Sequence, residues 1–197
     1  MSDLVVASIK RGEVVILPLE HSYVYACDAF SLSAVNRLHQ LRNDQPGIAA
    51  QVLVASAQTL DGLAQGLTPD VKSLTKSFWP GLLTLLVQPN QSLSWDLGDG
   101  GNLKNFAVRS PSQKETLEVI SQTGPLAIAI AGLAGTPWVS KISNVHDLAA
   151  IDVGEIKPGP LSTVVALESG NLALNRVGAL TLEDLRKVVS AIQLPNE

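Results

Sequence analysis

Residues 125–133 read Pro-Leu-Ala-Ile-Ala-Ile-Ala-Gly-Leu, the longest apolar run in the chain. A helix that crosses a bilayer needs about 20 apolar residues, so this run is too short to span a membrane. Its length and its Ile and Leu residues instead predict a strand buried inside a folded domain. The strand is the starting point for interpreting its neighbours.

Helical and strand patterns are interleaved around this stretch. Apolar residues at helical spacing predict helices over residues 2–10, 31–42, 70–78, 112–122 and 181–192, with a short helix capped by Asn144. Apolar and β-branched runs predict strands over residues 13–17, 51–55, 82–87, 105–109, 126–131, 161–167 and 172–175. Because the two kinds do not alternate strictly, we expect an α/β fold with one open, mixed parallel and antiparallel sheet flanked by helices. No linker is visible, so residues 1–197 are interpreted as a single domain.

Short local signals mark several element ends. Ser112 with Glu115, and Thr181 with Asp184, have the spacing of capping boxes. The tetrapeptide at 168–171, Glu-Ser-Gly-Asn, predicts a turn between the last two strands. Residues 90–104 are rich in Gly, Asn and Asp, which predicts a long loop.

Composition narrows the class of protein. Apolar residues make up 46% of the chain and charged residues 16%, which excludes a disordered chain. The net charge of −4 argues against a globally basic nucleic-acid binder. The single cysteine, Cys27, cannot form an internal disulfide, and residues 1–11 lack the apolar core of a signal peptide. We therefore expect a cytoplasmic protein.

The sequence lacks the common motifs for binding metal ions and phosphates. The three histidines, His21, His39 and His146, are far apart and have no metal-ligand spacing. Neither a Walker A motif nor a GxGxxG motif is present. We assign no metal site, and Cys27 is interpreted as a small buried residue.

Six sequence blocks, taken together and in their order along the chain, carry a resemblance to a known family. They are Ile-Leu-Pro-Leu-Glu-His-Ser-Tyr-Val-Tyr-Ala-Cys-Asp at 16–28, the 34–44 segment ending Leu-Arg-Asn-Asp, Phe-Trp-Pro-Gly-Leu-Leu-Thr-Leu at 78–85, Ala-Val-Arg-Ser-Pro at 107–111, Pro-Leu-Ala-Ile-Ala-Ile-Ala-Gly-Leu-Ala-Gly-Thr-Pro at 125–137, and Leu-Ser-Thr-Val-Val at 161–165 followed by Asn-Arg-Val-Gly-Ala at 175–179.

Over about residues 13–180 this set resembles the YrdC-type threonylcarbamoyl-AMP synthase family. The resemblance implies a twisted α/β sheet around a concave cleft. It also implies synthesis of threonylcarbamoyl-AMP and pyrophosphate from L-threonine, bicarbonate and ATP, for the t6A37 modification of tRNA. ATP would be a substrate, either alone or as its Mg²⁺ complex, and no tightly bound cofactor is implied. The resemblance also implies double-stranded RNA or tRNA as a partner and a homodimeric state. It implies no membrane association.

The resemblance also implies roles for individual residues. Arg109, Ser162 and His21 fall on the threonine side, whereas the nucleotide side would use Arg176, Arg42, Asn105 and Ser140. No catalytic residue is assigned. A guanidinium suits a carboxylate because it donates two parallel hydrogen bonds. We expect Arg109, Arg176 and Ser162 to converge on one cavity that holds an anion. The alternatives are a surface arginine at a strand end for Arg109, a salt bridge near the last helix for Arg176, and a strand hydroxyl for Ser162.

Several family positions are replaced. The first motif has Leu19, His21 and Val24 in place of Thr, Thr and Gly, and Asp44 stands where the family has an arginine. The Ser-Ala-Asn triplet becomes Ile-Ala-Gly at 130–132. Each lost hydrogen bond to a charged ligand group costs about 1.5–3 kcal/mol. The carboxylate of Asp44 is expected to repel a triphosphate.

Three functions stay open from the sequence. The first is an active synthase that tolerates the replacements. The second is a divergent paralogue that binds another nucleotide or a small carboxylate, or that performs other acyl-adenylate chemistry. The third is a non-catalytic module that binds RNA or a protein, which the net charge of −4 disfavours for RNA.

Overall fold

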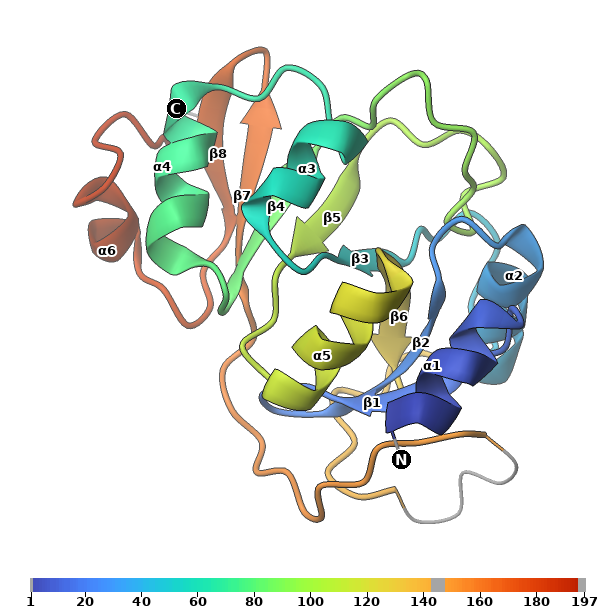
Figure 1. The fold of residues 1–197 in the computed structure, drawn as a ribbon. Helices are drawn as coiled ribbons and strands as arrows, with labels where there is room; N and C mark the ends of the chain where they lie inside the picture. Colours follow the sequence, from blue (N-terminus) through green and yellow to red (C-terminus); the bar gives the residue numbers. More distant parts are fainter. Residues whose placement is uncertain (1, 143–147, 195–197) are drawn as a thin grey trace.

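The computed structural model describes residues 2–142 and 148–194, and its framework is an eight-stranded sheet with helices packed against it (Figure 1). The helices are α1 (Ser2–Lys10), α2 (Leu32–Arg42), α3 (Ala57–Leu63), α4 (Pro69–Phe78), α5 (Lys114–Thr123) and α6 (Leu182–Arg186). The strands are β1 (Val15–Pro18), β2 (Tyr23–Asp28), β3 (Gln51–Leu53), β4 (Leu83–Val87), β5 (Phe106–Arg109), β6 (Leu126–Ile130), β7 (Thr163–Glu168) and β8 (Asn171–Arg176).

The strands lie in the order β1-β2-β6-β3-β5-β4-β7-β8. The β3–β5 and β4–β7 pairs are parallel, and the other pairs are antiparallel. The expected open, mixed sheet flanked by helices is therefore confirmed. The apolar run that begins at residue 125 forms β6, which lies between β2 and β3 inside the sheet.

Alternating side chains bury both faces of the first half of the sheet. In β2, Val24 and Ala26 pack with α1 and α5, whereas Tyr23, Tyr25 and Cys27 belong to the other core cluster, which includes α2. Successive strand residues point to opposite faces, so a strand covered on both sides has apolar residues at every position. Burial raises the pKa of the Cys27 thiol to about 12, which keeps it protonated and unreactive.

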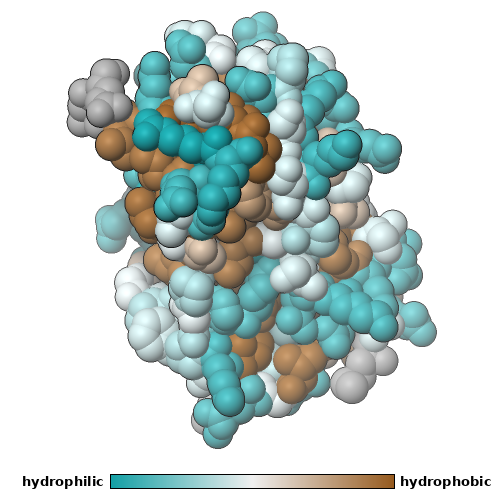
Figure 2. Space-filling view, turned by 90° about the vertical axis from the view of Figure 1, so that its left-hand side faces the viewer, coloured by the Kyte–Doolittle hydropathy of each residue, from teal (hydrophilic) through white to brown (hydrophobic). Residues whose placement is uncertain are grey.

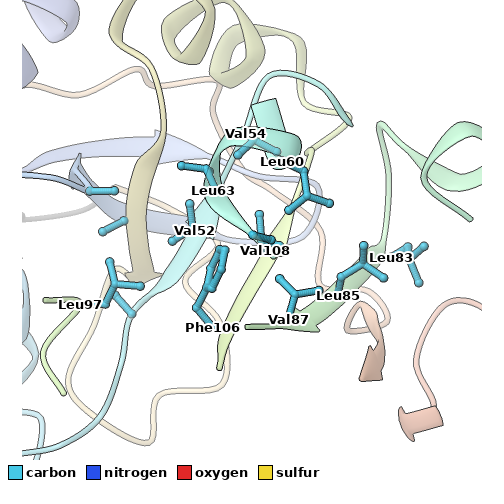
Figure 3. Packing of buried hydrophobic residues seen from close by; sticks show 14 of the residues in the cluster. Val52, Val54, Leu60, Leu63, Leu83, Leu85, Val87, Leu97, Phe106 and Val108 are labelled. Carbon is cyan, nitrogen blue, oxygen red and sulfur yellow. The ribbon is translucent and has the colours of Figure 1, made fainter. Parts of the chain in front are cut away.

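The second half of the sheet is packed mainly by aliphatic side chains around the ring of Phe106. Figure 3 shows Phe106 of β5 among side chains from β3, β4, α3 and the loop that carries Leu97. Phe106 and Leu97 are fully buried. The chain is only 4% aromatic, so Leu, Val and Ala fill most of this space.

Two elements were not predicted, and two helix predictions were wrong in detail. Strand β2 and helix α3 were both missed, and α3 is short and has no side-chain cap. The predicted capping box at Ser112 and Glu115 does not form. Helix α5 starts at Lys114 after an N-cap at Gln113, because Ser112 instead donates from its N–H and its hydroxyl to Glu20.

The C-terminal part agrees with the sequence except for the length of the last helix. The Thr181 and Asp184 capping box is present, but α6 ends at Arg186 and not near residue 192. The 168–171 turn joins β7 and β8, and Ser169 and Gly170 both have positive φ there (49° and 85°), which is typical of a tight hairpin turn. The predicted cap at Asn144 lies outside the described residues.

The surface on the side of α4, α6 and β8 is mainly hydrophilic, with an apolar area in its upper half (Figure 2). Within residues 2–142 and 148–194, no helix is both long enough and apolar enough to cross a bilayer.

Candidate functional site

One cavity gathers side chains from many segments of the chain. Its volume is about 320 Å³, which is within the usual range for small-molecule sites. Four of the segments that line it border regular elements: the β1–β2 turn, the end of α2, the residues before β3 and the end of β6. Residues 137–138, residues 159–162, Arg109 and Arg176 also line it. Loop and strand ends therefore meet here on a rigid sheet.

Arg109 at the end of β5 forms a buried ion pair with Glu20. Its Nη1 and Nη2 donate to the two carboxylate oxygens of Glu20 at 2.9 and 2.8 Å, and Nη1 also donates to the Gly81 carbonyl at 3.3 Å. Burial by itself would raise the pKa of Glu20, but the guanidinium of Arg109 and the N–H of Ser112 outweigh burial and lower that pKa to about 2. Glu20 is therefore charged at neutral pH and holds Arg109 in place.

A chain of polar side chains forms a second wall. Gln51 Nε2 donates to Thr84 Oγ1 at 3.2 Å, and Thr84 donates to Ser162 Oγ at 2.8 Å. Arg176 donates to the carbonyl oxygen of Ser162 at 2.9 Å and to its hydroxyl at 3.3 Å. Ser162 thus fixes the position of Arg176, and the described residues include no carboxylate that forms an ion pair with Arg176.

A third group lies at the end of α2. Arg42 Nε donates to both carboxylate oxygens of Asp44 (3.2 and 3.0 Å), and Arg42 Nη1 donates to the carbonyls of Ile130 and Gly132. His39 Nδ1 lies 2.9 Å from the same carboxylate. Asp44, which is expected from the sequence to repel a triphosphate, has a side chain that is only 5% exposed and is paired with Arg42, so the pairing offsets part of its charge.

His21 lines the cavity, in contact with the segment before β7. A Cβ placed on Gly159 would lie 2.4 Å from two atoms of the His21 ring, so only glycine permits this approach. The ring position therefore depends on the 159–162 segment.

The structure brings five of the seven predicted site residues to the cavity: Arg109, Ser162, His21, Arg176 and Arg42. Asn105 is not among the lining residues. It precedes β5, whereas Arg109 ends that strand, and four residues of strand extend about 13 Å. Ser140 does not line the cavity either, and its carbonyl accepts a hydrogen bond from the N–H of Ile156 at 2.8 Å.

Sequence reasoning missed several residues of the site. Glu20 is not among the predicted site residues, although it is the partner of Arg109. Ile48, Trp138 and Leu161 also line the cavity. Ile48 and Trp138 lie outside the regular elements, and Leu161, which was predicted to begin a strand, lies just before β7.

Comparison with known proteins identifies the family. The sequence model of the Sua5/YciO/YrdC family, described as "Telomere recombination", matches residues 7–178. The chain belongs to the Sua5/YciO/YrdC family. Within this family, a putative threonylcarbamoyl-AMP synthase from Mycobacterium tuberculosis is 30% identical over 190 residues, which cover 93% of this chain and 87% of that protein.

Two solved structures of the Sua5/YciO/YrdC family show the same fold. Sua5 from Pyrococcus abyssi, in a complex with L-threonine, matches with a TM-score of 0.87 and 27% identity over 98% of this chain and 58% of that chain. YciO from Escherichia coli matches with a TM-score of 0.77 and 17% identity over 94% of both chains. The threonylcarbamoyl-AMP synthase from P. abyssi is 29% identical, and the match covers 56% of its length.

The cavity is equipped for anions. Its arginines, Arg42, Arg109 and Arg176, reach it from three separate elements. In the part of the chain that the structure describes, no three His, Cys, Asp or Glu side chains are grouped so that they could hold a metal. Arginine N–H groups and a serine hydroxyl suit carboxylate and phosphate oxygens.

Proposed function

We propose that this chain is a threonylcarbamoyl-AMP synthase-like protein whose cavity binds L-threonine and an adenine nucleotide. The observation that carries the proposal is the convergence of Arg109, Ser162 and Arg176 on one cavity. The names of its relatives support the choice of reaction, and the complex of P. abyssi Sua5 with L-threonine supports the choice of amino acid.

The reaction places specific demands on the cavity. The amine of L-threonine and bicarbonate form a carbamate with loss of water. A carbamate oxygen then bonds to the α-phosphorus of ATP, and the bond from that phosphorus to the oxygen that bridges it to the β-phosphorus breaks to release pyrophosphate. Negative charge therefore gathers where the reactants meet, and fixed cations and hydroxyls stabilise it. Arg176, held by Ser162, is placed to meet a phosphate oxygen.

Arg109 retains the capacity to bind a carboxylate. A guanidinium has five N–H donors, and the bonds from Arg109 to Glu20 and Gly81 use three of them. In this proposal the remaining donors, together with the Ser162 hydroxyl, contact the threonine carboxylate. Glu20 orients the guanidinium and is not itself a contact to the substrate.

A second candidate is a paralogue that binds the nucleotide without turnover. Two of the three cavity arginines, Arg42 and Arg109, already have a carboxylate partner. Less positive charge is then left for the phosphates of ATP than a cavity with three unpaired arginines would supply. Ile130 and Gly132 also supply no side-chain hydrogen bond there.

Pyrophosphate release distinguishes the two candidates. The purified protein is incubated with ATP and bicarbonate, with and without L-threonine, and calorimetry measures the binding of ATP, AMP and L-threonine. Threonine-dependent pyrophosphate, lost in Arg176→Gln, supports the synthase. Binding without turnover supports the second candidate, and neither binding nor turnover contradicts both.

The resemblance further suggests a cytoplasmic protein that meets tRNA, and it leaves duplex RNA as a partner to test. The formal net charge of −4 disfavours a broad electrostatic RNA surface. A gel shift with duplex RNA at physiological salt decides the question, and size-exclusion chromatography with light scattering tests the expected homodimer.

A further inference from the structure

Three large apolar side chains line the cavity and are also exposed to solvent. Ile48, Trp138 and Leu161 line it and are 48%, 50% and 58% exposed, whereas Arg109, on the same cavity wall, is 5% exposed. They come from three different segments, before β3, after β6 and before β7. Exposed apolar groups on a cavity that also holds three arginines suit a ligand with one anionic end and one apolar end.

The backbone beside Trp138 is held in place although Trp138 itself is half exposed. The neighbouring Val139 donates its N–H to Ser22 Oγ and accepts from the N–H of Tyr23, both at 2.8 Å. These two bonds fix the backbone beside Trp138 to the start of β2. The fold therefore fixes the backbone position from which the indole extends.

The other two tryptophans have partners inside the protein. Trp79 donates its indole N–H to the Leu83 carbonyl at 2.7 Å. Trp95 lies between the rings of Phe30 and Phe106, with centroid distances of 5.4 and 5.0 Å. Trp138 forms no aromatic pair with another described residue, and it alone of the three lines the cavity.

We propose that Trp138 is a base-stacking residue, and that the nucleotide binds with its adenine ring on this indole and its phosphate toward Arg176. The inference rests on the proposed function, since it assumes that an adenine nucleotide is the ligand. An indole face and a purine face attract each other by stacking, and an aliphatic side chain of similar size lacks this geometry.

Trp138→Leu and Trp138→Phe form a matched pair for the test. Leu keeps a smaller apolar side chain without an aromatic face, and Phe keeps an aromatic face. Tryptophan fluorescence is recorded while AMP is added to each protein, and calorimetry gives the dissociation constants. Ribose 5-phosphate is the second probe, because it carries the phosphate without the base. L-Threonine binding is measured in parallel as a control for the folded cavity.

The expected result is quenching by AMP in the wild type that disappears in Trp138→Leu, with AMP affinity lower by about 5- to 100-fold. Trp138→Phe retains most of the affinity, and ribose 5-phosphate binds the wild type and Trp138→Leu equally. If AMP binds Trp138→Leu as tightly as the wild type, stacking is overturned while the proposed function stands. If the wild type binds neither AMP nor L-threonine, the proposed function itself fails.

Discussion

Arg109 and Glu20 face each other through two nearly equal hydrogen bonds of 2.9 and 2.8 Å, which join positions that are 89 residues apart in the chain. Both side chains are largely buried, and the pair links the end of β5 to the turn between β1 and β2. Bidentate guanidinium–carboxylate pairs are among the strongest side-chain interactions in proteins. This pair therefore anchors one wall of the cavity.

Glu20→Gln is expected to destabilise the fold by about 3 kcal/mol, because it leaves the buried guanidinium of Arg109 without a counter-charge. Urea unfolding followed by circular dichroism measures the change. Glu13→Gln is the matched control, since Glu13 forms a similar bidentate pair with Arg11 on the surface. A much smaller change is expected there, because exposed pairs contribute little. Equal effects of the two substitutions would contradict the structural role of Glu20.

The same carboxylate predicts a pH dependence of stability. The pKa of Glu20 is about 2 in the fold against an ordinary value of 4.5, so its stabilisation is complete above pH 4.5 and is lost as the pH falls toward 2. The difference in unfolding free energy between wild type and Glu20→Gln should shrink over that window by roughly 3 kcal/mol. Chemical denaturation at pH 6, about 3.5 and about 2.5 tests this. A difference that is constant with pH would be inconsistent with the ion pair.

Asp44→Asn is expected to strengthen ATP binding, because it removes the carboxylate that pairs with Arg42 inside the cavity. The gain should be about 1 kcal/mol, or roughly fivefold in the dissociation constant, and it should be smaller for AMP. Calorimetry with both nucleotides measures it. Asp61→Asn, at a surface pair with Lys72, is the control and should leave both affinities unchanged. Weaker ATP binding by a folded Asp44→Asn protein would argue that Asp44 positions Arg42 for the ligand instead of weakening its charge.

Gly178→Ala is expected to displace the backbone of Leu161 and Ser162, which line the cavity. A Cβ at this position would lie 2.3 Å from the Leu161 carbonyl oxygen and 2.6 Å from the Ser162 carbonyl group, so the backbone before β7 must shift. We expect a loss of about 2 kcal/mol in stability and a measurable loss of AMP affinity. Thermal unfolding and calorimetry provide the readouts.

The control for Gly178→Ala is Gly62→Ala in α3, where the added methyl group meets no atom within 4 Å. Alanine is a better helix former than glycine, so that substitution should be neutral or stabilising by up to about 1 kcal/mol. A Gly178→Ala protein as stable as wild type would show that the 161–162 backbone is not constrained as described.

Much of the fold could be predicted from the sequence, because its signals are local. The apolar run beginning at residue 125 forms the internal strand β6, and the Thr181 and Asp184 capping box forms as predicted. Strand β2 was missed, although its consecutive buried residues are the pattern of a strand covered on both faces. The false capping box at Ser112 has a clear cause, since a tertiary partner, Glu20, competes for the same groups.

The site was less predictable, because its partners are distant in the chain. The convergence of Arg109, Ser162 and Arg176 was expected from family motifs, and the structure places all three at one cavity. The pairing of Arg109 with Glu20 and of Arg42 with Asp44 depends on how the turns fold back, which residue types alone do not reveal. The place of Trp138 was also not predictable from residue types, because it depends on the hydrogen bonds that the backbone of Val139 forms with Ser22 and Tyr23.

A crystal structure of this chain with AMP and L-threonine tests the central claim most directly. We predict density for both ligands in the cavity, with the AMP phosphate in hydrogen-bond contact with Arg176 and the threonine carboxylate near Ser162 and Arg109. Ligands bound elsewhere on the molecule, with this cavity holding only solvent at saturating concentrations, would contradict the claim.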